Sequence, residues 1–237
     1  MAKKGGRMIG WLAAVACIVV IAWLITPLAP QLLGRATRRV STQEKIVALT
    51  FDDGPSADWT PAVLELLARH DVPATFFLVG SRAADNPALA QQIWYAGHQV
   101  GNHSWSHTPL IGKSVAVVRQ EIEKTDVFLR ALGYTHELYF RAPWGFKLLI
   151  LPWILSRLGK KHILFDVVTW DWSCPGAAVI TQSAVKAVRP GSIILLHDGG
   201  GDRSQTVQAT EEIIVQLKNQ GYRFVTVAQL LTYDVRA

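Results

Sequence analysis

The sequence predicts an α/β fold with about seven parallel strands, arranged as an open sheet or as a barrel. Short β-rich runs alternate with amphipathic segments along most of the chain, which is the pattern of repeated strand–helix units. The runs are short and mostly apolar rather than alternating, as expected for parallel strands that are covered on both faces. The chain has 237 residues, 50% of them apolar, which suits one large domain with an appendage.

The expected strands are short apolar runs spread between residues 46 and 227. They are residues 46–51, 74–79, 98–101, 138–141, 162–167, 192–196 and 223–227. Amphipathic segments between them carry helix start and stop signals, because proline suits the first helical turn and glycine the position after the last turn. These signals are Thr60-Pro61, Asn86-Pro87, Gly97, Gly133 and Gly221.

The run at 148–155 is apolar without a break. Its simplest interpretation is a buried helix on the outside of the fold. The alternative is a membrane-facing patch beside the functional site. Replacing Leu149 and Trp153 with serine separates the two, because only a membrane-facing patch loses vesicle binding without unfolding.

The N-terminal segment differs in composition from the rest of the chain. Residues 1–7 are basic, and residues 8–34 contain no charged residue. As a helix with a rise of about 1.5 Å per residue, 8–34 would extend roughly 40 Å, enough to span a bilayer. We therefore expect a single uncleaved transmembrane anchor at 8–34. The alternative is a cleaved signal peptide, but its apolar region is usually shorter, about 7–15 residues, and the exit shows no Ala-x-Ala site.

A polar, basic linker is expected at 35–44, followed by one folded domain at 45–237. The net charge of +6 comes from the six basic residues of 1–43, because the remaining 18 basic residues are balanced by 18 acidic ones. No basic face for nucleic acid is expected on the domain. The two cysteines, Cys17 and Cys174, lie in different regions, so neither a disulfide within the domain nor a cysteine-ligated structural zinc is expected.

Side chains that can bind a metal or transfer a proton follow the ends of five expected strands. In parallel α/β folds the carboxyl ends of the strands meet on one side, where functional residues gather. These residues are Asp52 and Asp53, His103 and His107, Arg141 and Trp144, Asp171 and Trp172, and His197 with Asp198. Packing alone explains one such coincidence but not five, so we expect a single site on this rim.

Asp53, His103 and His107 are candidate ligands of a catalytic metal. On a helical turn, histidines four residues apart would place both rings on one side. Two histidines and one carboxylate leave coordination positions open, as catalytic sites require. Zinc fits this set, and Co²⁺, Fe²⁺ and Mn²⁺ remain candidates. The alternatives are a pair of unrelated loop histidines and an Asp-Gly turn that only caps a strand.

The remaining polar residues suit proton transfer. Asp52 and His197 could act as base and acid on the two sides of a metal. Arg141 could hold Asp52 ionised, and Asp171 could keep His197 protonated. The alternatives are a surface salt bridge for Arg141 and a hydrogen-bonded core histidine for His197. The tryptophans at the strand ends are equally compatible with a pocket wall and with core packing.

These segments together resemble the polysaccharide deacetylase family, the NodB-homology enzymes of carbohydrate esterase family 4. The resemblance covers residues 45–232 and lies in five ordered motifs. They are Thr50-Phe51-Asp52-Asp53, His103-Ser104-x-x-His107, Arg141-x-Pro143-Trp144, Asp171-Trp172 and Leu195-x-His197. Any one motif is weak, but their order is specific.

The resemblance implies a distorted, incomplete (β/α) barrel that removes N-acetyl groups from amino sugars with one divalent metal. It implies the following roles: Asp52 as base, His197 as acid, Arg141 and Asp171 as their supports, and Asp53, His103 and His107 as metal ligands. The backbone N–H of Trp144 would donate to the oxyanion, and Leu195 and Trp172 would line the acetyl pocket. The chain departs from the family pattern at Val168, where an aspartate is frequent, and at Trp144, where tyrosine is frequent.

We therefore expect a membrane-anchored N-deacetylase whose domain lies outside the cytoplasm, or is secreted if the anchor is cleaved. An N-acetylated glycan, peptidoglycan by analogy, is the expected substrate, and the sequence indicates no obligate protein partner. The alternatives are a deacylase of a lipid-linked or small N-acyl or O-acetyl sugar, a non-haem iron oxygenase, and a carbohydrate-binding protein without catalysis.

Overall fold

The computed structural model describes residue 11, residues 34–146 and residues 149–235. The expected basic N-terminus at 1–7 lies outside the described residues, and so does the expected anchor at 8–34 except for its residues 11 and 34. In the part of the chain that is described, no helix is both long and apolar enough to cross a membrane.

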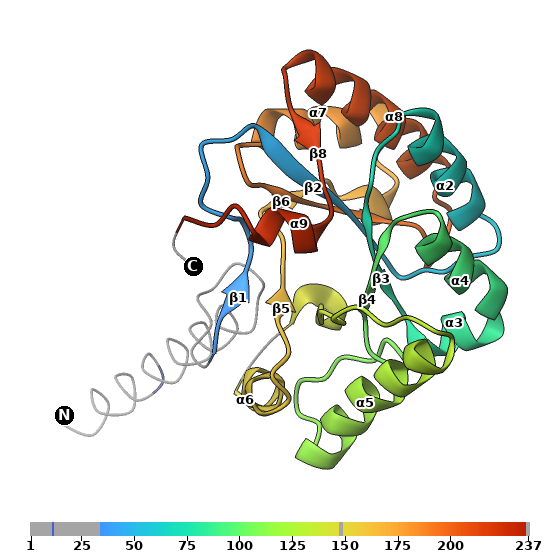
Figure 1. The fold of residues 1–237 in the computed structure, drawn as a ribbon, viewed down its shortest axis with the longest axis vertical. Helices are drawn as coiled ribbons and strands as arrows, with labels where there is room; N and C mark the ends of the chain where they lie inside the picture. The colour runs from blue at the N-terminus through green and yellow to red at the C-terminus, as the bar shows by residue number, and fades with distance from the viewer. Residues whose placement is uncertain (1–10, 12–33, 147–148, 236–237) are drawn as a thin grey trace, which may run out of the picture.

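A parallel sheet with β2 near its middle forms the centre of the fold (Figure 1). Its strand order is β4-β3-β2-β7-β6, and β8 also pairs with β2. The strands are β2 (Ile46–Asp52), β3 (Thr75–Leu78), β4 (Gln99–Asn102), β6 (Val167–Val168), β7 (Ile193–His197) and β8 (Arg223–Phe224). The expected α/β fold with mostly parallel strands is confirmed.

Further pairings continue the sheet beyond β4. Phe140 bridges Asn102 on one side and His162 on the other, and β5 (His162–Ile163) pairs with β1 (Ala36–Thr37). The segment after β5 then returns to β7 through β6. Together the paired strands form an incomplete ring. Phe140 contributes only isolated bridges to it, and no pairing joins β5 to β6 among the described residues.

The interruptions correct two expected strands. The run at 138–141 is reduced to the bridges of Phe140, because the Leu138 carbonyl accepts a hydrogen bond from Lys160 Nζ instead of joining a ladder. The run at 162–167 is split, because the carbonyls of Ile163 and Leu164 accept from the Arg141 guanidinium. The expected strand at 223–227 ends early, since Val227 begins helix α9 (Val227–Leu231).

Part of the segment expected as a linker, 35–44, joins the folded domain. β1 lies within it, and Val40 is fully buried. The Val40 N–H donates to the Gly191 carbonyl at 2.9 Å, and Arg39 forms an antiparallel bridge with Ser192. The folded part therefore begins ahead of the expected boundary at residue 45.

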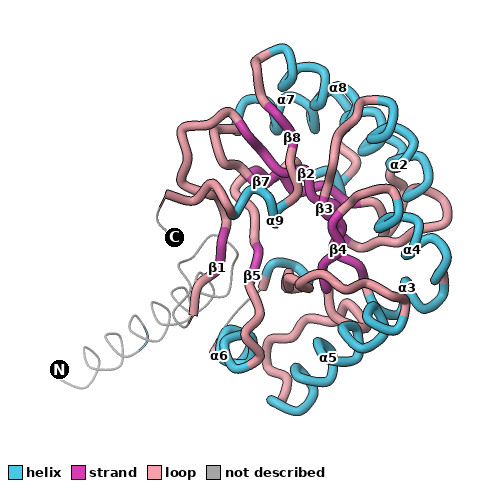
Figure 2. Tube along the Cα trace, in the orientation of Figure 1, coloured by secondary structure: helices cyan, strands magenta, loops and turns pink. Residues whose placement is uncertain are grey.

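Helices cover the outside of the central strands, as Figure 2 shows. The expected helices appear as α2 (Thr60–Arg69), α4 (Pro87–Tyr95), α5 (Val115–Ala131) and α8 (Ser204–Asn219). Additional helices that the sequence pattern did not predict are α3 (Gly80–Asp85), α7 (Ala177–Ala187) and α9, together with the 3₁₀ turns η1 (Pro143–Gly145) and η2 (Asp171–Ser173).

The apolar run at 148–155 contributes to α6 (Ile150–Arg157), which packs beside α5. Leu151, Ile154 and Leu155 are buried in a cluster with residues of α5, as the core interpretation requires. Leu149, Ile150 and Trp153 are exposed. The core interpretation is confirmed for the buried face of this helix, and the membrane-facing interpretation of its exposed face stays a prediction.

Alternation along β2 aims its polar residues at the interior. Val47, Leu49 and Phe51 belong to the core cluster beneath the helices, whereas Ile46 and Ala48 belong to the interior cluster. By the two-residue period of a strand, Thr50 and Asp52 share the inward face. Asp52 is in register with His197 on β7, which places the expected base and acid on neighbouring strands.

Candidate metal centre and active site

Asp53 directly follows β2 and has a left-handed backbone conformation, with φ of 71°. This conformation is uncommon for residues other than glycine. It separates Asp53 from its neighbour, so that the two adjacent carboxylates face different partners. Arg82 Nη1 donates a hydrogen bond to the Asp53 carbonyl and helps to hold the turn.

Asp53, His103 and His107 come together as expected. One ligand atom from each lies within 4.8 Å of the others. Asp53 Oδ1 is 2.8 Å from His107 Nε2 and 3.5 Å from His103 Nε2, and the imidazole rings are 5.0 Å apart. Despite these short distances, Oδ1 is buried without a partner in hydrogen-bond geometry. The three atoms converge on a common point, which fits a shared cation better than direct hydrogen bonds.

The two histidines lie on a loop after β4 and not on the helical turn considered in the sequence analysis. Ser104 and His107 are left-handed, with φ of 66° and 59°. The Asn102 side chain accepts a hydrogen bond from Ser104 N–H at 2.8 Å, and Ser104 Oγ accepts one from His107 N–H at 3.1 Å. The loop brings the rings together through these bonds instead of helical periodicity.

His103 is oriented as a metal ligand. Its Nδ1 lies 2.9 Å from the Arg141 carbonyl, which can only accept, so Nδ1 carries the proton and donates. The lone pair of Nε2 then points toward Asp53. Burial raises the pKa of Asp53, but the neighbouring imidazoles of His103 and His107 lower it by more, leaving it well below the usual range. This geometry and ionisation fit a divalent cation held by Asp53, His103 and His107.

Asp52 is paired with a fully buried arginine. Arg141 Nη1 donates to Asp52 Oδ1 and to Thr50 Oγ1, both at 2.7 Å. The guanidinium also lies 4.0 Å from the centre of the Phe77 ring. Burial lowers the pKa of Arg141, and Asp52 opposes that shift. The other carboxylate oxygen, Oδ2, is 3.8 Å from His103 Nε2 and faces the candidate metal ligands.

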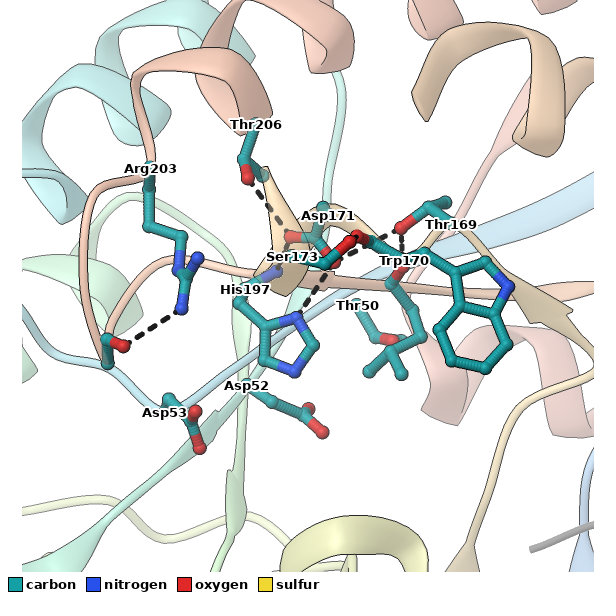
Figure 3. A network of polar contacts seen from close by, with 12 residues as sticks. Thr50, Asp52, Asp53, Thr169, Trp170, Asp171, Ser173, His197, Arg203 and Thr206 are labelled. Carbon is teal, nitrogen blue, oxygen red and sulfur yellow. Dashed lines mark hydrogen bonds and ion pairs between the residues drawn. The ribbon is translucent and has the colours of Figure 1, made fainter. Parts of the chain in front are cut away.

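His197 is held by Asp171 (Figure 3). Asp171 Oδ1 accepts from His197 Nδ1 at 2.9 Å, and Oδ2 accepts from the His197 backbone N–H at 2.8 Å. Hydroxyls of Thr169 and Thr206 complete the shell of Asp171. Burial lowers the pKa of His197, but Asp171, with smaller effects of Asp52 and Asp53, raises it above its usual value. The group can therefore carry a proton to donate.

The three residues expected to contact substrate have different surroundings. Trp144 is 60% exposed, with φ of 62°, and its ring lies 5.8 Å from that of His107. Trp172 meets the His197 ring edge-on at 5.4 Å. Leu195 is buried in the interior cluster, two residues before His197 on the same face of β7. Val168, where the family often has an aspartate, pairs with Leu195 in the sheet. Arg141 still donates to the carbonyls of Ile163 and Leu164 without an aspartate at 168.

Asp198 is a buried acid whose role the sequence analysis did not identify. It accepts a hydrogen bond from Thr60 Oγ1 at 2.6 Å, and burial raises its pKa to about 7. A Cβ added at Gly54 would clash with Asp198 Oδ2. The carboxyl group therefore packs beneath the turn that carries Asp53. Its position next to His197, and the glycine after Asp53, were the available sequence signals.

An Asp-His-His cluster beside separate Asp-Arg and Asp-His pairs, at the strand ends of a parallel α/β fold, defines a candidate hydrolytic centre. The polysaccharide deacetylase family model matches residues 39–163. A peptidoglycan-N-acetylglucosamine deacetylase of Bacillus cereus is 40% identical over 209 residues, covering 84% of this chain and 94% of the relative. A chitooligosaccharide deacetylase of Sinorhizobium fredii is 37% identical, covering 79% and 93%.

Similarity extends to solved structures. The crystal structure of the Bc1960 peptidoglycan N-acetylglucosamine deacetylase has a TM-score of 0.80 and 35% identity, covering 83% of this chain and 92% of that one. The chain belongs to the polysaccharide deacetylase family, as the motifs indicated.

Proposed function

We propose that this chain is a metal-dependent N-deacetylase of a cell-envelope glycan, with peptidoglycan as the favoured substrate. Membership of the family supports an enzyme that acts on N-acetylated sugars. The observation that carries the proposal is the division of roles between adjacent carboxylates. Asp53 faces His103 and His107, whereas Asp52 is held by Arg141.

In the proposed mechanism, a divalent cation held by Asp53, His103 and His107 would polarise the acetyl carbonyl and acidify a neighbouring water. Asp52 takes the proton of the attacking water through Oδ2, while Arg141 keeps the carboxylate oriented. The backbone N–H of Trp144 donates to the oxygen on which charge develops.

His197 completes the reaction by protonating the leaving amine. Because Nδ1 is held by Asp171, the proton available for transfer is on Nε2. Burial lowers the pKa of His197, but Asp171 raises it above its usual value, so the imidazolium persists to higher pH than a free histidine would. Leu195 and Trp172 would bound the space for the acetyl group.

Acetate release from defined glycans tests this function. We expect release from peptidoglycan and from N-acetylglucosamine oligomers, loss of release with a chelator, and recovery on addition of Zn²⁺ or Co²⁺. The chain from residue 35 onward is the appropriate shorter form, because β1 and Val40 belong to the fold. Product analysis on an O-acetylated xylan and a lipid-linked sugar identifies the alternative substrates. Absence of cation-dependent release from every glycan contradicts the proposal.

We also propose that residues 8–34 anchor the domain to the cell membrane, with the active site outside the cytoplasm. Their uncharged composition supports this placement. The full chain should sediment with membranes in high salt and be released only by detergent, whereas the chain from residue 35 should remain in the supernatant. Recovery of the full chain in the soluble fraction, shortened at its N-terminus, would instead indicate a cleaved signal peptide.

A further inference from the structure

Two tryptophans lie side by side on the rim next to His197. Trp170 is 59% exposed and Trp172 is 39% exposed, and their ring centres are 5.0 Å apart. Trp172 meets the His197 ring edge-on, and Trp170 contacts Trp172, so Trp172 lies between Trp170 and His197 in this series of ring contacts. Core packing does not account for an indole that is mostly exposed.

The backbone at Trp170 is unusual for so large a residue. Its φ of 59° and ψ of 23° are left-handed, a region that bulky side chains rarely adopt. The carbonyl of Trp170 accepts hydrogen bonds from Ser173 N–H at 3.0 Å and Ser173 Oγ at 2.8 Å, which close the turn. Asparagine or glycine would suit this turn with less strain. The turn therefore does not explain why an indole occupies the position.

The direction of the indole follows from the residue after it. Asp171 is fully buried, with its carboxylate held by His197, Thr169 and Thr206. In Figure 3 the indole of Trp170 projects away from Asp171 and His197. The bonds that hold the Asp171 carboxylate inside the fold therefore leave the Trp170 indole on the rim.

A similar arrangement occurs on the metal side of the site. Trp144 is also left-handed and mostly exposed, and its ring lies near that of His107. Exposed indoles therefore lie beside His107, a proposed metal ligand, and beside His197, the proposed acid. The catalytic groups lie between them, so a bound molecule that spans the site can meet aromatic surface on both sides.

Indole rings suit the apolar C–H faces of pyranose sugars, and the indole N–H can donate to a hydroxyl or an acetamido oxygen. Basic and acidic residues are equal in number beyond residue 43, which does not favour a strongly charged ligand. Building on the proposed deacetylation, we propose that Trp170, with Trp172, binds the sugar ring next to the one being deacetylated. This subsite makes the enzyme selective for oligomeric and polymeric glycans.

The variant Trp170→Asn tests the subsite, because asparagine tolerates the left-handed backbone while removing the indole. On an N-acetylglucosamine tetramer, we expect kcat/KM to fall about tenfold through KM, as loss of one apolar contact surface of this size implies. On the monosaccharide N-acetylglucosamine, which has no neighbouring ring, kcat/KM should change less than about twofold, and Trp170→Phe should recover part of the loss on the tetramer.

Tyr95→Ala is the matched control. Tyr95 is an exposed aromatic residue on α4 that stacks on Trp94 at 5.2 Å, outside the site. Neither substrate should respond to this change. Equal losses of Trp170→Asn on both substrates, with a lower unfolding temperature, would show a structural role and overturn the inference. An unchanged preference for the tetramer would also overturn it.

Binding separates this inference from the proposed function. Calorimetric titration of the N-acetylglucosamine tetramer into Asp52→Asn, with and without Trp170→Asn, reports the subsite without turnover. We expect about tenfold weaker binding when Trp170 is replaced. If no glycan is deacetylated but this difference appears, the proposed function fails and the subsite stands. If deacetylation occurs and the two affinities are equal, the subsite fails and the function stands.

Discussion

Asp53→Asn is expected to abolish metal binding and acetate release together, whereas Asp52→Asn is expected to abolish acetate release while the metal stays bound. Asp53 lies at 2.8 Å and 3.5 Å from the ligand nitrogens of the two histidines, so its negative charge belongs to the cation site. Asp52 is instead bonded to Arg141. Loss of a general base costs about 10²–10⁴ in rate.

Metal content and acetate release, measured on the same preparations, check this asymmetry. Asp52→Asn leaves the buried Arg141 without its charged partner, so activity must be expressed per folded molecule after a thermal unfolding measurement. Asp85→Asn, an exposed change at the end of α3, is the matched control and should retain both properties. Loss of metal in both site variants to the same extent would contradict the separation of roles.

The site was predictable from sequence because its residues follow strands with strong local patterns. The mostly apolar run ahead of Asp52 and the isoleucine–leucine run ahead of His197 both become buried central strands. Parallel pairing then aligns their carboxyl ends, and Asp52 falls in register with His197. Local sequence was sufficient here because each side chain is carried by an element that is specified locally.

Other parts of the fold depend on contacts between distant residues. The helical turn considered for His103 and His107 is a loop, shaped by the Asn102 side chain and by left-handed residues. The break between β5 and β6 depends on the guanidinium of Arg141, which is 22 residues away from Ile163. No local pattern encodes such a bond, because the apolar composition of 162–167 is the same whether the segment forms one continuous strand or two short ones. The exposed position of Trp170 is not encoded locally either, since it depends on the bonds that hold Asp171 to His197 and Thr206.

The change Arg141→Met should destabilise the fold as well as abolish acetate release. Removing one partner of a buried ion pair typically costs about 3–5 kcal/mol, because the other charge stays buried without compensation. Here Asp52 would keep a negative charge in the interior, and the carbonyls of Ile163 and Leu164 would lose their donors. Methionine fills similar volume, which limits the contribution of an empty cavity. Urea unfolding of the variant measures the loss.

A double-mutant cycle distinguishes the charge from the backbone contacts. Asp52→Asn removes the uncompensated charge, so the double variant with Arg141→Met should recover part of the lost stability and none of the acetate release. Arg141→Lys keeps the charge but lacks the planar fork that reaches Asp52 together with Ile163 and Leu164, and its stability should be intermediate. If the double variant is no more stable than Arg141→Met, the carbonyl contacts dominate. The arginine would then act chiefly by closing the interrupted ring of strands, and its effect on Asp52 would follow from that closure.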